Sequence, residues 1–391
     1  MNLIIIPFHD WRKSHKEGFR TRDVHFINAL SGNDSVEKIL VINRPTTKFE
    51  LLYKKNDKAL PGKLIFTNDR FSLTEIKKNL YVTDFLSNDI FGQIMRKHLW
   101  FIEKYNDKKY VDFIYTCQKL LNIKETNLIA QNIFSYKLAV NLNAKSKIFD
   151  AWDNFLKFPA YKKIKKSLEL GYSELSKKIP NWVTNSQENI DFYKNKFNPL
   201  GVTLIKNGVK SNFMSGDKID PEDIRNLKRP IIGFGGKISY LLNFELINFI
   251  TKDNSDCSFV FVGQILDKNV FKKIEKRANV FFLGDKKYSE YSNYVKNFDV
   301  CIIPYNINER QHGGDSMKAY EYLLTGKKVI GTNGNGLQDL KEYIYLPNTK
   351  EEFSLELKDL TNKKNQINIE DYSWESKGES LLKILKKLMF L

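Results

Sequence analysis

Short runs of apolar residues alternate with segments of helical periodicity along the whole chain. This alternation is typical of parallel sheets covered by helices, so the sequence predicts an α/β fold. In the first half the apolar runs predict strands at residues 3–7, 38–42, 64–66, 113–115, 128–130, 147–149, 182–184 and 202–205. In the second half they predict strands at residues 230–234, 259–263, 280–284, 299–304 and 328–332.

A polar stretch separates the two halves. Residues 211–229 are rich in Asp, Asn and Lys and end directly before Pro230, a composition typical of a linker. The sequence therefore predicts a first Rossmann-like domain at 1–210, a linker at 211–229, a second Rossmann-like domain at 230–370 and a final segment at 371–391.

Composition excludes several classes of protein. Hydrophobic residues make up 42% of the 391 positions, too many for a disordered polycation. The apolar runs are far shorter than the roughly 18 to 20 residues that cross a bilayer, and the N-terminus has no signal-peptide layout, so we expect a cytoplasmic protein. Cys117, Cys257 and Cys301 lie in apolar, strand-like runs without metal-ligand spacing, and no disulfide framework or zinc site is expected.

The charge balance favours an acidic partner. The chain has 63 Lys+Arg against 46 Asp+Glu, a formal net charge of +17. No zinc-finger, RNP-type or basic-zipper pattern is present, so nucleotide phosphates or anionic lipids are favoured over nucleic acid. In residues 155–168 aromatic and aliphatic side chains alternate with lysines. Such a segment can rest on an anionic membrane surface or form an ordinary amphipathic surface helix.

The most informative stretch is residues 299–339. The predicted strand at 299–304 is followed by a polar loop, and Ser316 stands where a helix N-cap would. The helix that follows places Lys318 and Glu321 one turn apart. A helix N-terminus with a lysine in its first turn suits phosphates, and Glu321 could accept hydrogen bonds from ribose hydroxyls. The alternative is an ordinary Lys–Glu pair on a helix surface.

These segments resemble the donor-binding part of GT-B glycosyltransferases, in particular the teichuronic-acid and xanthan-type enzymes of bacterial surface polysaccharide synthesis. The resemblance implies two Rossmann-like domains whose parallel sheets face a cleft, with a final helix that returns to the first domain. It implies a nucleotide sugar, UDP- or GDP-linked, as co-substrate without a further cofactor. No Asp-x-Asp is placed to hold Mg²⁺ beside the phosphate site, so we expect transfer without a metal. The implied donor-binding residues are Gly235, Gly236, Lys237, Tyr288, Ser316, Met317, Lys318 and Glu321.

One departure from the family concerns stereochemistry. Retaining members of the wider superfamily carry a carboxylate where this chain has Gly313, and its absence argues for inversion. Inverting transfer needs a base that deprotonates the acceptor hydroxyl. The resemblance implies Asp153 as this base, with Asp150 in reserve, although Asp153 could instead be a helix N-cap.

Other polar residues near the first predicted strand stay open as alternatives. His9, His15 and His25 could supply a base or contact the acceptor, with His9 the main candidate, although isolated histidines are often structural. Arg20 and Arg22 could contact an acidic acceptor.

Together these patterns predict an inverting, metal-independent glycosyltransferase at the inner face of a bacterial cytoplasmic membrane. It would move a sugar from a nucleotide sugar to a surface glycan, which we take to be lipid-linked. The alternatives are a UDP-sugar 2-epimerase of the same fold and a basic nucleic-acid-binding protein.

Overall fold

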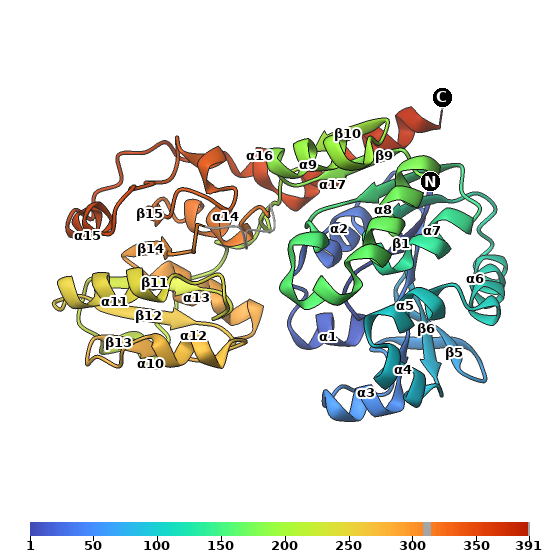
Figure 1. Ribbon diagram of the computed structural model, residues 1–391, viewed down its shortest axis with the longest axis horizontal. Helices are drawn as coiled ribbons and strands as arrows, with labels where there is room; N and C mark the ends of the chain where they lie inside the picture. Colours follow the sequence, from blue (N-terminus) through green and yellow to red (C-terminus); the bar gives the residue numbers. More distant parts are fainter. Residues whose placement is uncertain (308–313, 390–391) are drawn as a thin grey trace. The chain divides into compact units, whose positions relative to one another are not determined.

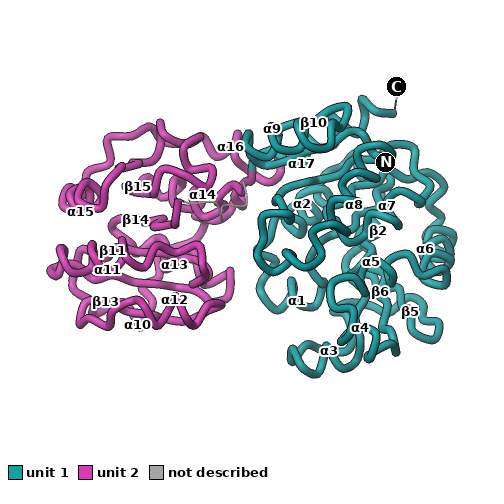
Figure 2. The backbone as a smooth tube through the Cα atoms, in the orientation of Figure 1, with its two compact units in different colours: residues 1–206, 377–391 teal, residues 207–376 magenta. Residues whose placement is uncertain are grey.

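The computed structural model describes residues 1–307 and 314–389 of the chain. The chain forms two compact units (Figure 2). Unit 1 comprises Met1–Lys206 and Lys377–Leu391, and unit 2 comprises Asn207–Ser376. Residues 211–229, the predicted linker, lie within unit 2.

Unit 1 is built on a mixed sheet with the strand order β10-β9-β8-β7-β1-β2-β6-β5-β4 (Figure 1). The strands from β10 to β6 in this order run parallel, whereas β5 is antiparallel to both β4 and β6. The two-residue β3 pairs with β6. The bounds are β1 Asn2–Ile6, β2 Lys38–Ile42, β3 Thr46–Thr47, β4 Lys63–Asn68, β5 Phe71–Lys77, β6 Leu80–Ser87, β7 Asn127–Ala130, β8 Ser146–Asp150, β9 Asn181–Thr184 and β10 Gly201–Leu204.

Two sequence predictions for unit 1 need correction. The strand predicted at 113–115 is part of helix α6 (Lys108–Leu120). Tyr110, Phe113, Ile114 and Cys117 are buried at helical spacing, so the apolar run is the inner stripe of a helix and Cys117 is not in a strand. The antiparallel strands β5 and β6 were not predicted at all, so this sheet is not purely parallel.

Helices connect and cover the strands of unit 1. Asp10, Thr47 and Asp89 cap α1, α3 and α4, each accepting a hydrogen bond from a backbone N–H of the first turn. Among the described residues, no helix is both long and apolar enough to cross a membrane. Besides α6, the helices are α1 Trp11–Lys16, α2 Arg22–Ser31, α3 Lys48–Tyr53, α4 Ile90–Arg96, α5 His98–Tyr105, α7 Tyr136–Asn141, α8 Lys165–Lys178, α9 Gln187–Phe197 and α17 Trp374–Leu388.

Unit 2 has a five-stranded parallel sheet with the order β13-β12-β11-β14-β15. Counted from β11, this is the 3-2-1-4-5 order of a Rossmann-like domain. The strands are β11 Ile231–Gly235, β12 Ser258–Val262, β13 Val280–Phe282, β14 Val300–Ile303 and β15 Lys328–Gly331, and all five were predicted. The helices are α10 Glu222–Arg225, α11 Phe244–Asp253, α12 Lys268–Lys273, α13 Tyr288–Asn297, α14 Met317–Leu323, α15 Lys350–Lys358 and α16 Ile369–Tyr372.

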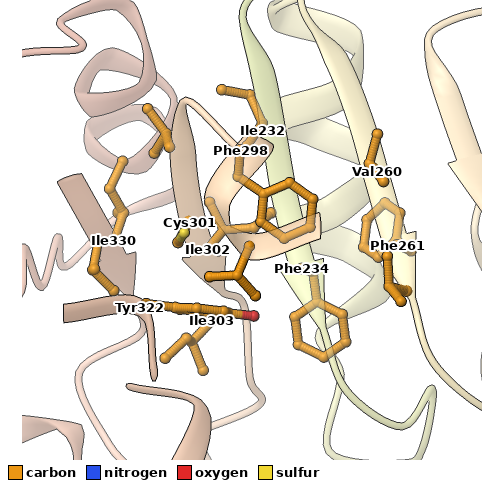
Figure 3. Close-up of a cluster of buried hydrophobic side chains, with 14 of the residues drawn as sticks. Ile232, Phe234, Val260, Phe261, Phe298, Cys301, Ile302, Ile303, Tyr322 and Ile330 are labelled. Carbon is orange, nitrogen blue, oxygen red and sulfur yellow. The ribbon is translucent and has the colours of Figure 1, made fainter. Parts of the chain in front are cut away.

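Burial on both faces of the unit 2 sheet explains why its strands could be predicted from the sequence. Every residue of β11, β12, β14 and β15 is buried, as expected for a parallel sheet covered on both faces. Figure 3 shows Phe298 beside Ile302 and Phe234 in this core. Gly233 makes room for Phe298, because a Cβ on Gly233 would lie 2.0 Å from the Phe298 ring.

A buried ion pair fixes α2 to β8 in unit 1. Arg22 Nη2 lies 3.0 Å from Asp150 Oδ1, and both side chains are almost completely buried. Gln131 Nε2 donates a further hydrogen bond of 2.9 Å to Asp150. Removing one partner of such a pair leaves an uncompensated charge in the core.

We expect Arg22→Met to lower the free energy of unfolding by about 3–5 kcal/mol, because Asp150 loses its counter-charge in the core. The control is Lys145→Ala, which breaks the exposed Lys145–Glu125 pair and should cost less than about 1 kcal/mol. Urea denaturation followed by circular dichroism measures both. Equal losses in the two variants would contradict the assignment.

Candidate functional site

The sheet of unit 2 has a topological switch point between β11 and β14, because the chain passes from β11 to β12 and β13 on one side and then crosses to β14 on the other side of β11. Ligands of open α/β sheets bind beyond the carboxyl ends of the strands at such a point. The chain leaves β11 at Gly235 and Gly236, and it leaves β14 at Pro304 and Tyr305. A donor-binding residue is therefore expected to lie at this edge of the sheet.

Lys318 lies directly against the turn after β11. A Cβ on Gly236 would lie 2.7 Å from Lys318 Cε and 3.1 Å from its Nζ, and Gly236 has a φ of 151°. Only glycine adopts this backbone conformation readily and leaves room for the lysine. The Lys318 ammonium donates a hydrogen bond to the Tyr305 hydroxyl, and it lies 5.5 Å from the centre of the Phe234 ring.

The turn after β12 packs equally closely on this glycine. Gly263 has a φ of 149°, and a Cβ there would lie 2.0 Å from the carbonyl oxygen of Gly236. The N–H of Gly236 donates to the carbonyl of Val262 at 2.8 Å. The Lys318 ammonium makes no ion pair with a carboxylate in the described part of the chain. Within the described residues, the cation beside the glycine turn thus has no carboxylate within ion-pair distance.

Glu321 and Tyr288 are in direct contact. The Tyr288 hydroxyl donates to Glu321 Oε1 at 2.7 Å, and the glutamate is only 5% exposed. Burial raises the pKa of Glu321, against the opposing effects of the Tyr288 hydrogen bond and of the Lys318 and Lys210 charges. Two residues chosen from distant parts of the sequence therefore meet.

Lys210 belongs to this group and was missed by the sequence analysis. Its ammonium lies 4.7 Å from the centre of the Tyr288 ring. Burial lowers the pKa of Lys210, while the Glu321 charge acts in the opposite direction. No motif surrounds Lys210 in the sequence, so only the fold shows that it adds a second cation near Glu321.

Ser316, Met317 and Lys237, the remaining predicted donor residues, have fewer contacts that indicate a role. Ser316 is at the N-cap position of α14, but its side chain makes no capping hydrogen bond, and its buried oxygen has no partner among the described residues. Met317 opens the helix and is half-buried, and Lys237 is exposed. Gly313, on which the inversion argument rests, lies outside the described residues.

Unit 1 contains a cavity at its own switch point. The cavity of about 330 Å³ lies beyond β1, β2 and β7, and β1 is the strand from which the connections diverge. Aromatic and cationic side chains dominate its lining. The lining residues are Phe8, His9, Asp10, Lys13, Arg44, Glu50, Lys54, Asn56, Lys97, His98, Phe101, Asn132, Phe134 and Tyr161.

His9 is held in this cavity by a buried carboxylate. His9 Nδ1 lies 3.0 Å from Asp23 Oδ2, and Asp23 Oδ2 also accepts from the His9 N–H at 2.8 Å. Burial opposes ionisation of Asp23, but the charge and hydrogen bonds of His9, with a bond from the Thr21 hydroxyl, set the pKa of Asp23 below its usual range. Asp23 orients the ring through Nδ1, so in a neutral ring with its proton on Nδ1 the acceptor would be Nε2.

The cavity is lined by four Lys or Arg side chains against two carboxylates. Arg44 and Lys54 both pair with Glu50, at 2.6 and 2.5 Å, whereas Lys97 has no ion-pair partner among the described residues. Burial and then the charges of Arg44, Lys54 and Lys97 lower the pKa of His98. With aromatic rings on its walls, the cavity suits an anionic group attached to an apolar or sugar ring.

The other predicted residues of unit 1 do not line this cavity. Asp153 is 8% exposed, and its carbonyl accepts from the Tyr193 hydroxyl at 2.9 Å. Asp150 pairs with Arg22, and both side chains are almost completely buried, a geometry typical of a structural ion pair. Arg20 pairs with Glu17 at 3.3 Å.

The segment 155–168 also departs from its prediction. It forms two short 3₁₀ turns, at Phe155–Lys157 and Pro159–Ile164, before α8 begins. Phe155 and Leu168 are buried in the core, so they are not free to enter a membrane. Tyr161 reaches the cavity, and the exposed side chains of the segment include the lysines at 162, 163, 165 and 166.

No protein-family model matches the chain. Similar solved structures include sucrose-phosphate synthase from Thermosynechococcus elongatus, with a TM-score of 0.65 and 12% identity over 99% of both chains. HepE from Anabaena, solved with UDP and glucose, has a TM-score of 0.63 and 13% identity over 99% of this chain and 100% of its own. These proteins have the GT-B fold, and this chain shares it with two Rossmann-like domains.

A relative by sequence is TuaH of Bacillus subtilis (strain 168), a candidate glycosyltransferase of teichuronic acid biosynthesis. It is 27% identical over 149 residues, which cover 37% of this chain and 38% of the relative. A candidate UDP-N-acetylglucosamine 2-epimerase from Listeria monocytogenes also shares the fold, with a TM-score of 0.55 and 10% identity over 99% of this chain and 96% of its own.

Proposed function

We propose that this protein is a glycosyltransferase that takes a sugar from a UDP-linked donor. The observation that carries this proposal is the Lys318 ammonium beside the Gly236 turn at the switch point of unit 2. The resemblance to a teichuronic acid glycosyltransferase candidate and the fold shared with HepE, solved with UDP and glucose, support it.

In this proposal the charge on the leaving diphosphate is stabilised by Lys318. The glycine turn lets phosphates approach the backbone, and the fixed ammonium offsets negative charge as the sugar departs. Glu321 would accept hydrogen bonds from the ribose hydroxyls, and Tyr288 would hold its carboxylate in place. Lys210 would add positive charge on the same side.

Lys318→Ala should weaken UDP binding by about tenfold or more, because a charge-assisted contact to phosphate is lost. Lys341→Ala is the control, since it removes an exposed lysine of the same unit. Isothermal titration with UDP compares both variants with the unaltered protein. Unchanged affinity in Lys318→Ala would remove the basis of the donor site.

The cavity of unit 1 is proposed to receive the acceptor. Its cations and aromatic walls suit a glycan linked to lipid through phosphate. The exposed lysines at 162, 163, 165 and 166 would meet anionic lipid on the inner face of a bacterial cytoplasmic membrane.

We assign the acceptor base to His9 in preference to Asp153. Asp23 orients the His9 ring, and His9 lines the cavity, so its Nε2 can take a proton from a hydroxyl bound there. Asp153, implied by the family resemblance, lies outside the cavity lining. It stays as the alternative base.

His9→Ala should reduce kcat by about 100-fold or more while UDP affinity is retained, since the base acts on the acceptor and not on the donor. Asp153→Asn should keep most of the activity. A radiolabelled transfer assay to membrane-extracted acceptor, with UDP titration as the binding control, separates the two candidates. Loss of turnover only in Asp153→Asn would identify Asp153, and not His9, as the base that deprotonates the acceptor.

We further propose that transfer inverts the anomeric carbon and needs no metal. Inversion rests on Gly313 at the position of the superfamily's carboxylate. The anomeric proton coupling of the product in NMR should therefore show the configuration opposite to that of the donor. Turnover should be unchanged by EDTA. Retained configuration would contradict inversion. Loss of activity with EDTA that Mg²⁺ restores would contradict metal independence.

A further inference from the structure

Helices α3 and α4 expose an unusual number of large apolar side chains. Six of them define the surface that we call the α3–α4 surface: Phe49 (48% exposed), Leu52 (79%), Tyr53 (80%), Phe91 (76%), Ile94 (51%) and Met95 (65%). Single exposed apolar residues are ordinary, but a cluster on two adjoining helices marks an interaction site.

The two helices are joined side by side. Gln93 Nε2 of α4 donates to Glu50 Oε2 of α3 at 2.5 Å, and the Thr47 hydroxyl donates to Gln93 Oε1 at 2.5 Å. Figure 1 shows α3 and α4 as neighbours in unit 1. On α3 the exposed residues recur at i, i+3 and i+4, so they form one face of that helix. The polar side chains between the helices thus leave apolar faces for solvent or a partner.

Cations surround this surface. Lysines and an arginine on or next to the two helices are exposed. Two of the three nearby carboxylates are already paired, Glu50 with Arg44 and Lys54 and Asp89 with Arg96 and Lys104. The cations are Lys48, Lys54, Lys55, Lys58, Arg96 and Lys97, and the carboxylates are Glu50, Asp57 and Asp89. Apolar side chains rimmed by positive charge match the headgroup region of an anionic bilayer.

The same elements lead into the cavity of unit 1. Glu50 and Lys54 of α3, with Lys97 and His98 directly after α4, line that cavity. Lys97 also has the backbone angles φ 50° and ψ −119°, a conformation that costs free energy in any residue other than glycine. Because α3 and the residues after α4 both line the cavity, a lipid head group could reach it while the acyl chains stay in the bilayer under α3 and α4.

We propose that the α3–α4 surface docks this protein onto anionic bilayers, with its apolar side chains in the headgroup region and its cationic rim on lipid phosphates. This goes beyond the proposed function, which places only the lysines of 155–168 against lipid. The docking requires neither donor nor acceptor, so it can be tested without any assumption about transfer.

The test is co-sedimentation of the full chain with vesicles of phosphatidylcholine mixed with phosphatidylglycerol, and with vesicles of phosphatidylcholine alone. The double variant Leu52→Asn with Phe91→Asn should bind the mixed vesicles about tenfold more weakly, because two apolar anchors are lost. The matched control is Leu200→Asn with Leu355→Asn, at positions that are 83% and 67% exposed in the turn before β10 and in α15. The control should bind like the unaltered chain.

Two outcomes would overturn the proposal. One is equal binding by the double variant and the unaltered chain, with loss of binding confined to Lys162→Gln with Lys163→Gln. The other is self-association of the unaltered chain in light scattering that the double variant abolishes without any change in vesicle binding, since the surface would then serve a second copy. Circular dichroism and thermal unfolding verify that each variant is folded, and neither measurement depends on the donor-site proposal.

Discussion

The position of Lys318 at the edge of the unit 2 sheet is coupled to the absence of a side chain at Gly236. Gly236 has a φ of 151°, which residues with a Cβ rarely adopt, and a Cβ there would lie 2.7 Å from Lys318 Cε. With that space kept open, a single ammonium is held between two aromatic rings at the switch point of a Rossmann-like sheet. A cation in such a position, unpaired with any carboxylate of the described chain, is suited to phosphate rather than to a structural ion pair.

Unit 1 also has its candidate site at the switch point of a sheet, but the residues there have different chemistry. Its cavity also lies beyond the carboxyl ends of parallel strands where the connections diverge, but its walls carry rings, cations and an oriented histidine. Asp23 contributes by staying ionised in the core, where hydrogen bonds from His9 and Thr21 offset the cost of burial. In the proposed function, unit 2 would stabilise charge on the leaving group and unit 1 would remove a proton from the acceptor.

The sequence was most informative where strands are buried on both faces. β11, β12, β14 and β15 are continuous apolar runs ended by Gly or Pro, so their positions and the glycine turn could be predicted. It failed at residues 113–115, where a short apolar run fits a strand and a helix stripe equally well. The His9–Asp23 pair and Lys210 could not be predicted, because only tertiary packing brings each of them to its partner.

The central claim is that unit 2 holds the diphosphate of a nucleotide sugar at Lys318, and a crystal structure of the protein with UDP tests it most directly. The account predicts phosphate oxygens within hydrogen-bonding distance of Lys318 Nζ and a ribose hydroxyl on the Glu321 carboxylate. UDP bound elsewhere, with Lys318 still donating only to Tyr305, would contradict it.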